Sequence, residues 1–175
     1  MRTLKQIMLF AMVLGAFSFS SCSSDDDGGN PADTTAGSGT ITAKIDGSSF
    51  TSLEMTSIAN KVTAGGQSTL VIQGNTQSQA FQFTINAYDG VGTYEFTDAN
   101  VFRIASYIEP NVSNPANTQT WSAPYENSGV AGEISISEET DSNIKGTFFF
   151  TGKNSNDNST KSITEGSFNL TLQVQ

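Results

Sequence analysis

The sequence contains no histidine and only one cysteine, Cys22. These absences exclude a Ser-His-Asp or Cys-His catalytic group, a zinc site built on histidine or several cysteines, and an internal disulfide. Basic residues are also scarce, because eight Lys and Arg stand against 17 Asp and Glu, a formal net charge of −9. Binding to a phosphate backbone needs a positive surface, so the sequence argues against nucleic acid as a partner. With 175 residues, the chain is long enough for one domain.

Long hydrophobic runs are missing except near the N-terminus. Residues 7–17 (IMLFAMVLGAF) form an uncharged apolar stretch of 11 residues that follows Arg2 and Lys5. Spanning a bilayer takes about 20 residues, so this stretch is too short for a transmembrane helix. A positive start followed by a short apolar run is typical of a secretory signal. We therefore predict a lipoprotein signal peptide over residues 1–21.

The small residues that precede Cys22 resemble the lipobox of bacterial lipoproteins, although Phe19 stands where that motif most often has Leu. The resemblance implies that the Cys22 thiol receives a diacylglyceryl group and that acyl chains such as palmitate anchor the protein in the outer membrane. Several chains give stable anchoring, whereas one chain is marginal. The alternative is an ordinary signal peptide cut near Ser20, which would leave Cys22 as an exposed free thiol. Such a thiol is a liability in a secreted chain, and this favours lipidation.

An acidic run follows the cysteine directly. Asp25, Asp26 and Asp27 resemble the surface-export signal of Bacteroidota lipoproteins, which sends a protein to the outer face of the outer membrane; the alternative is a solvated linker. No large apolar residue occurs in residues 23–39, so burial cannot offset the entropy of ordering them. We predict that residues 22–39 are the lipidated Cys and a disordered tether. Thr34 lies in a stretch that resembles a Bacteroidota O-glycan acceptor, and an unmodified tether is the alternative.

From Thr40 onward, apolar and polar residues alternate, as in Phe81, Phe83 and Ile85, which are separated by Gln82 and Thr84. A period of two predicts strands with one buried face and one wet face. Turn signals such as Asp-Gly and Gly-Gly separate the runs. The expected strands are 40–46, 49–56, 58–63, 68–74, 80–88, 91–97, 101–108, 119–123, 130–137, 143–151 and 161–174. Short strands with local turns predict an all-β fold, a single antiparallel β-sandwich over residues 40–175, with an up-and-down or flattened, lipocalin-like barrel as the alternative.

One run breaks the alternation. In the stretch 146–150, Phe148 and Phe150 share a face with Ile144, whereas Phe149 points to the other side of the strand. We expect either that both faces of this strand are covered or that Phe149 lies under a loop.

Several short pieces, taken together and in order, resemble an uncharacterised domain family of Bacteroidota lipoproteins. The pieces are Ala43-Lys44-Ile45-Asp46-Gly47 with Phe50, Gly92-Thr93-Tyr94, Gly132-Glu133-Ile134-Ser135-Ile136, Gly146-Thr147-Phe148 with Phe150, and Glu165-Gly166-Ser167-Phe168. The likeness covers nearly the whole domain. The family has no established activity, so the resemblance implies architecture and supplies no catalytic residues.

Candidates for chemistry are few. Paired carboxylates could serve a glycoside hydrolase, which needs two of them flanking the bond to be cut. Spacing selects no pair among the six available, which are Asp89, Glu95, Asp98, Glu109, Glu126 and Glu133. Two oxygen-rich stretches, 138–143 and 154–158, have the ligand type that calcium prefers, but neither matches an EF-hand loop. We therefore predict no enzyme activity, no cofactor and no metal.

The long Pro- and Asn-containing loop from Glu109 to Gln119 is the candidate binding region, because loops of this length often carry function. Tyr107, Trp121 and Tyr125 bracket it, and flat aromatic rings can stack on sugars or peptides. The alternative is that Trp121 fills the core. The predicted function is a non-catalytic binding or envelope-associated module, with a glycan or peptide as the ligand, on a surface-exposed outer-membrane lipoprotein. A small-ligand carrier and a glycan-processing enzyme are the alternatives.

Overall fold

The computed structural model describes residues 36–175, and its regular structure consists of β-strands and two short 3-10 helices. The strands are β1 (Thr40–Ile45), β2 (Ser48–Thr51), β3 (Ile58–Ala64), β4 (Gln67–Asn75), β5 (Ala80–Asn86), β6 (Gly92–Thr97), β7 (Arg103–Glu109), β8 (Gln119–Ala123), β9 (Val130–Glu139), β10 (Asn143–Lys153) and β11 (Thr160–Val174). The helices are η1 (Glu54–Thr56) and η2 (Pro115–Asn117). The all-β prediction is confirmed.

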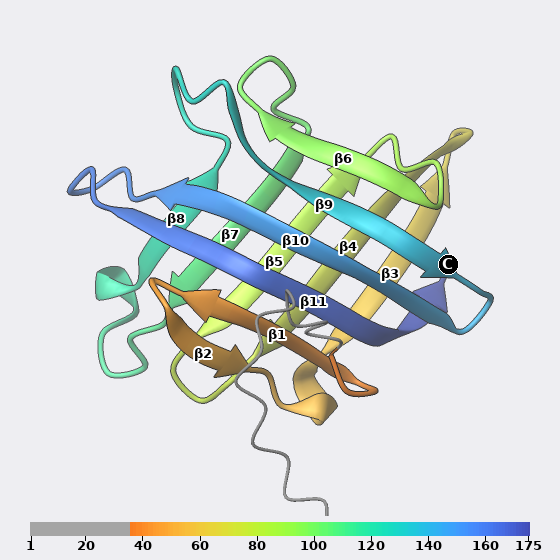
Figure 1. Cartoon of the computed structure of the whole chain (residues 1–175), viewed down its shortest axis with the longest axis horizontal. Coiled ribbons are helices and arrows are strands. Elements are labelled where there is room, and N and C mark those ends of the chain that lie inside the picture. Colours follow the sequence, from red (N-terminus) through yellow and green to blue (C-terminus); the bar gives the residue numbers. More distant parts are fainter. Residues whose placement is uncertain (1–35) are drawn as a thin grey trace, which may run out of the picture. The chain divides into compact units, whose positions relative to one another are not determined.

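The strands form one sheet that folds over itself into two layers. Their order is β2-β1-β11-β3-β4-β5-β7-β8-β10-β9-β6, and β10 also pairs with β11. Figure 1 shows β2, β1, β11, β10, β9 and β6 in the nearer layer, and β3, β4, β5, β7 and β8 behind them, running at a steep angle to the first group. Side chains from the two inner faces can therefore meet across the space between the layers.

The sheet is mixed, and this corrects the prediction of a purely antiparallel fold. The last residues of β11 run parallel to β3, with Leu172 opposite Ala59 and Val174 opposite Lys61. Earlier in the same strand, β11 pairs antiparallel with both β1 and β10. The 15-residue strand thus leaves the nearer layer at its C-terminal end and joins the other. Local alternation cannot reveal this change of partner, because it reports which face is buried and not which strand lies alongside.

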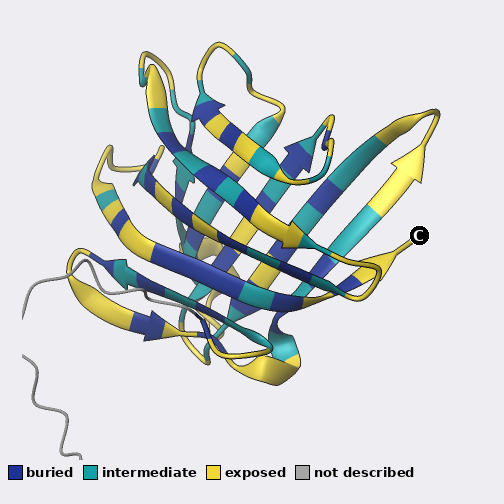
Figure 2. Cartoon of the chain, turned by 45° about the vertical axis from the view of Figure 1, so that its right-hand side comes forward, coloured by how far each residue is buried: buried dark blue, intermediate teal, exposed yellow. Residues whose placement is uncertain are grey.

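Aromatic rings fill the space between the layers. Phe81 and Phe83 point inward from β5, and the ring centroid of Phe148 from β10 lies 5.5 Å and 4.7 Å from theirs. Phe150 lies 6.0 Å from Phe83, and Phe96 of β6 lies 6.2 Å from Phe150. Buried and exposed residues alternate along most strands, as the sequence predicted (Figure 2). Contacts between rings at these distances add to the area that they bury, so they hold the layers together.

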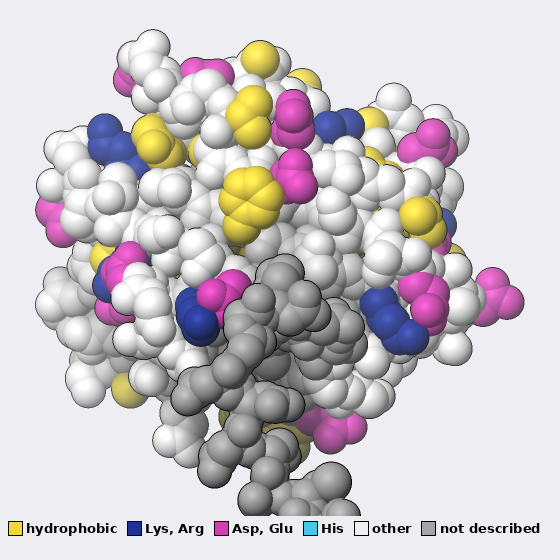
Figure 3. Space-filling view, in the orientation of Figure 1, with side chains coloured by type: hydrophobic (Ala, Val, Ile, Leu, Met, Phe, Trp, Pro, Cys, Tyr) yellow, Lys and Arg dark blue, Asp and Glu magenta, His cyan; other side chains and the backbone are white. Residues whose placement is uncertain are grey.

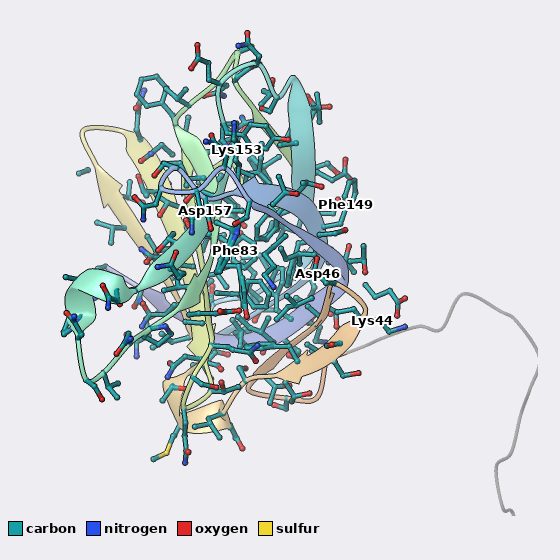
Figure 4. The ribbon with its side chains drawn as sticks, turned by 90° about the vertical axis from the view of Figure 1, so that its left-hand side faces the viewer. Lys44, Asp46, Phe83, Phe149, Lys153 and Asp157 are labelled. Carbon is teal, nitrogen blue, oxygen red and sulfur yellow. The ribbon has the colours of Figure 1, made fainter. Side chains whose placement is uncertain are left out.

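Phe149 lies on the outer side of β10, as the pattern predicted. In the edge-on view of Figure 4, Phe83 points into the space between the two layers, whereas Phe149 points away from that space. Its side chain is 50% exposed, so neither the predicted second layer nor a loop from residues 36–175 encloses it. The space-filling view shows that apolar side chains on this face are isolated among polar ones (Figure 3). Apolar side chains that are scattered singly on a surface are normal, so an exposed Phe149 needs no covering element.

Two segments of the described chain differ in detail from the sequence-based expectation. Ala36, the first described residue, is buried, and the Gly39 amide donates to the Asn169 carbonyl at 2.7 Å, whereas Gly37 and Ser38 are exposed. Ala36 and Gly39 therefore contact the strands that follow. The strand expected over 49–56 ends at Thr51, because the chain turns there into η1 and Leu53 donates its amide to the Asn75 carbonyl at 2.9 Å.

Candidate functional site

The loop from Glu109 to Gln119 connects β7 to β8 and is held by its own polar side chains. The Asn114 amide donates to Asn111 Oδ1 at 2.9 Å, and the Asn111 amide donates to Thr118 Oγ1 at 3.2 Å. The helix η2 then closes the loop, because the Asn117 amide donates a hydrogen bond to the Asn114 carbonyl at 2.9 Å. Asparagine and threonine commonly make such local turns. The loop therefore has a defined shape although it buries little apolar surface.

Two grooves meet at this loop. The first, the end groove, has a volume of about 500 Å³ and is lined by Ser78, Gln79, Glu109, Pro110, Asn111, Val112, Asn117 and Gln119. The second, the sheet groove, has a volume of about 360 Å³ and is lined by Gln73, Gly74, Asn75, Thr76, Gln77, Ala80, Phe81, Gln82, Ile108, Pro110 and Val112. Pro110 and Val112 line both, so the two grooves adjoin at these residues. Figure 1 shows the β7–β8 loop and the β4–β5 turn side by side at the lower left.

A chain of hydrogen bonds fixes the side chains at one side of the end groove. Gln79 Nε2 donates to the Tyr107 hydroxyl at 2.8 Å, and that hydroxyl donates to Glu109 Oε1 at 2.8 Å. Burial of the ring, together with the bond to the Glu109 carboxylate, raises the pKa of Tyr107 above its ordinary value. The hydroxyl therefore keeps its proton at neutral pH and continues to donate. As a result the Glu109 carboxylate is held in one orientation at the groove wall.

The opposite side of the end groove is fixed in the same way. Asn154, which is buried in the loop after β10, donates Nδ2 to Gln119 Oε1 at 2.8 Å. Gln119 Nε2 then donates to the Asn117 carbonyl at 3.1 Å. Both ends of the Gln119 amide are thus engaged, and its orientation is set before any ligand arrives. Such ordering lowers the entropic cost of binding.

The predicted aromatic patch is not assembled as an exposed surface. Tyr107 and Trp121 are paired in register on β7 and β8, and both point into the core, with exposed fractions of 0% and 6%. Their rings stack at 5.6 Å, and Trp121 Nε1 donates to Ser159 Oγ at 2.9 Å. Tyr125 is partly exposed, and the Lys153 ammonium lies 5.8 Å from its ring centroid. Of the predicted binding region, the loop remains available to a ligand, whereas the faces of two of the three rings do not.

Trp121 also closes one edge of the core beside the grooves. The Lys161 ammonium lies 5.3 Å above its ring and forms an ion pair with Asp46, 3.0 Å from Oδ2. Asp46 accepts the Ser162 amide as well, and this bond together with Lys161 lowers the pKa of Asp46. Figure 4 places Asp46 at the turn between β1 and β2, on the side that faces the viewer. The charged pair therefore covers the ring and shields it from water.

The candidate acidic residues do not gather at the grooves. Glu109 is the one carboxylate among the residues that line them. Glu95 and Glu133 are opposite each other on β6 and β9, which lie in the other layer. Asp89 and Asp98 lie in turns, as their neighbours in the sequence predicted, and Glu126 lies in the turn that follows β8. The two grooves therefore contain a single candidate carboxylate, and the facing pair of Glu95 and Glu133 lines neither of them.

The two oxygen-rich stretches are hairpin loops whose polar groups bond to the protein. Asn154 Oδ1 accepts the Asn156 amide at 2.9 Å, and Asp157 Oδ1 accepts the Ser159 amide at 2.8 Å. In the other loop, Thr140 Oγ1 accepts the Asn143 amide at 3.0 Å. Within residues 36–175, no group of three or more Cys, Asp or Glu side chains is placed to hold a metal ion. The same part of the chain contains no helix of the length and apolarity that crossing a membrane requires.

The glutamines of the sheet groove were not among the residues predicted from the sequence. Gln73 and Gln82 lie opposite each other on β4 and β5, on the outer face of the sheet. The sequence did contain a signal for them, because Gln73 and Gln82 occupy solvent-exposed positions of strands whose other polar positions include threonine. Cys22, the acidic residues Asp25, Asp26 and Asp27, and Thr34 lie outside the described residues.

The fold and the grooves define a two-layered all-β domain with an open, polar surface site at one end. A family model, the domain of unknown function DUF6252, matches residues 37–170, and the chain belongs to this family. This confirms the expected membership of an uncharacterised family. Searches of curated proteins and of solved structures found no match.

Proposed function

We propose that this protein is a non-catalytic binding module of the cell envelope, anchored through acyl chains on Cys22 in the outer membrane and displayed on the cell surface. The observation that carries the binding role is the pair of adjoining grooves at the β7–β8 loop, of which the end groove has wall side chains held in place by hydrogen bonds. Open grooves with oriented polar groups bind ligands without needing catalytic residues. The anchor is supported by the signal-like residues 1–21 and by the position of Cys22 after them.

The structure favours this role over the two alternatives. A small-ligand carrier needs an enclosed cavity, whereas the space between the layers is occupied by the rings of Phe81, Phe83, Phe148 and Phe150. A glycoside hydrolase needs two convergent carboxylates, whereas Glu109 is the one carboxylate among the residues that line the grooves.

The anchor is tested by growing cells with an alkyne fatty acid. The wild-type chain should be labelled and Cys22→Ser should not, because the thiol is the acceptor. Equal labelling of the two chains would contradict lipidation at this position. Replacing Asp25, Asp26 and Asp27 by Ala should leave the protein bound to the membrane but hidden from protease added to whole cells. Unchanged protease access would reduce the acidic run to a linker.

The binding role is tested separately, with the unlipidated chain from Ser23 onward fixed to a resin. A variant whose loop residues 111–117 are replaced by a short Gly-Ser linker is the control. The wild-type resin should retain material from polysaccharide or peptide fractions of the cell envelope and medium, and the loop variant should retain several-fold less. Equal retention on both resins would contradict the site, whatever the chemical class of the retained material.

A further inference from the structure

We infer that the two grooves bind a neutral carbohydrate; this inference rests on the proposed binding function and names its ligand class. The first support is the composition of the lining. Of the 17 residues that line the grooves, eight carry a carboxamide, four in each groove, and none is Lys or Arg. One carboxylate, Glu109, is present, and it already accepts the Tyr107 hydroxyl. An anionic ligand would find no cation, and a cationic ligand would find a single carboxylate already engaged.

The second support is the state of the amides. Within residues 36–175, the side chains of Gln73, Gln77 and Gln82 have no hydrogen-bond partner, and Gln73 and Gln82 are exposed and opposite each other. Side chains that face each other on neighbouring strands lie about 5 Å apart. A carboxamide carries a donor and an acceptor side by side, and neighbouring hydroxyls of a sugar complement both. The sheet groove therefore presents two adjacent sites of that kind.

The third support separates a sugar from an extended peptide. An extended peptide that binds to a β-sheet gains affinity by pairing its backbone with a free strand edge. The floor of the sheet groove is the face of β4, β5 and β7, whose backbones are already paired with one another. The side chains that line this groove are mainly amides and apolar groups, the latter including Ile108, Pro110 and Val112. A sugar ring offers hydroxyls to the former and its C–H face to the latter, so it matches the groove better than a peptide.

The experiment is a titration of the ¹⁵N-labelled unlipidated chain, followed through the side-chain amide resonances of Gln73 and Gln82. The neutral probes are hexasaccharides of glucose, mannose, galactose and xylose in α- and β-linkage. The comparison probes are oligogalacturonate and a set of uncharged hexapeptides. At least one neutral hexasaccharide should shift these resonances, with a Kd on the order of 10⁻⁴ M because the grooves are open. The double variant Gln73→Ala with Gln82→Ala should weaken binding at least tenfold.

Gln67→Ala provides the matched control, because Gln67 lies exposed at the other end of β4 and lines neither groove. Its affinity should stay within twofold of the wild type. If oligogalacturonate or a hexapeptide shifts the groove resonances while every neutral sugar fails, the ligand class is wrong and the binding role stands. If no probe shifts them, the carbohydrate inference is overturned, and the loop-dependent retention test decides the binding role on its own.

Discussion

Trp121 is the side chain whose removal tests the described core most directly. It is 6% exposed, stacks on Tyr107 at 5.6 Å and donates its indole N–H to Ser159. Truncating a buried tryptophan to alanine costs about 3–5 kcal/mol. The described domain has 140 residues, and an unfolding entropy of about 2.1 cal/mol/K per residue gives about 0.3 kcal/mol per degree. Trp121→Ala should therefore lower the Tm by about 13 °C, measured by far-UV circular dichroism.

Two further variants make the test specific. Trp121→Phe keeps a ring against Tyr107 but loses the indole N–H, so it should cost about 1–2 kcal/mol. Phe102→Ala is the aromatic control, because Phe102 is 68% exposed and should cost about 1 kcal/mol or less. In the wild type, the emission of Trp121 should be blue-shifted and should resist quenching by acrylamide. A drop in Tm no larger than that of Phe102→Ala, or an emission typical of a solvated indole, would refute the packing of this ring.

Three other predictions concern stability. Gly146→Ala should destabilise the domain by about 3 kcal/mol in urea unfolding, because its Cβ would lie 2.1 Å from the Ser135 carbonyl oxygen, whereas Gly37→Ala, with its nearest neighbour at 3.6 Å, should cost under about 1 kcal/mol. Burial alone would raise the pKa of Glu139, but the hydrogen bonds that its carboxylate accepts from Lys61 and Tyr88 lower the pKa overall. The difference in the free energy of unfolding between the wild type and Glu139→Gln should therefore be full above about pH 4.3. It should shrink as the pH falls through the lowered pKa. The Tm of the unlipidated chain should not change with a chelator or a reductant, and a large drop with chelator would restore the two oxygen-rich loops as calcium sites.

Much of the fold was predictable because a strand with one buried and one solvent-exposed face shows alternating apolar and polar residues in the sequence. Every expected strand overlaps an observed one, including the C-terminal strand, predicted over 161–174 and observed from Thr160 to Val174. The error after Thr51 has a tertiary cause. The chain turns into η1 because residues distant in sequence accept its amides, such as the Ile41 carbonyl bonded to Ser52 at 2.9 Å. The local alternation of apolar and polar residues cannot predict hydrogen bonds to residues that are distant in the sequence.

The β7–β8 loop was predictable from the sequence, but the side chains that line the grooves beside it were not. Loop length and asparagine content identified the β7–β8 loop, since both are local properties of the chain. The direction of the aromatic rings was not decided, because Tyr107 and Trp121 face inward together only through the pairing register of β7 and β8. The contribution of Gln73 and Gln82 depends on the neighbouring β4–β5 hairpin lying under the same loop, and this is a contact between segments about thirty residues apart in sequence.

The position of β11 has a consequence for how the domain is made. This last strand pairs with β1, the first strand, and also with β10 and β3. Until Thr160–Val174 have been made, a growing chain lacks one of the strands that join the two layers, since the other junction is the pairing of β8 with β10. Contacts between such distant segments form slowly, so the described domain closes at this edge late in folding. A chain cut before Thr160 would retain ten of the eleven strands and lose the one to which the first strand attaches.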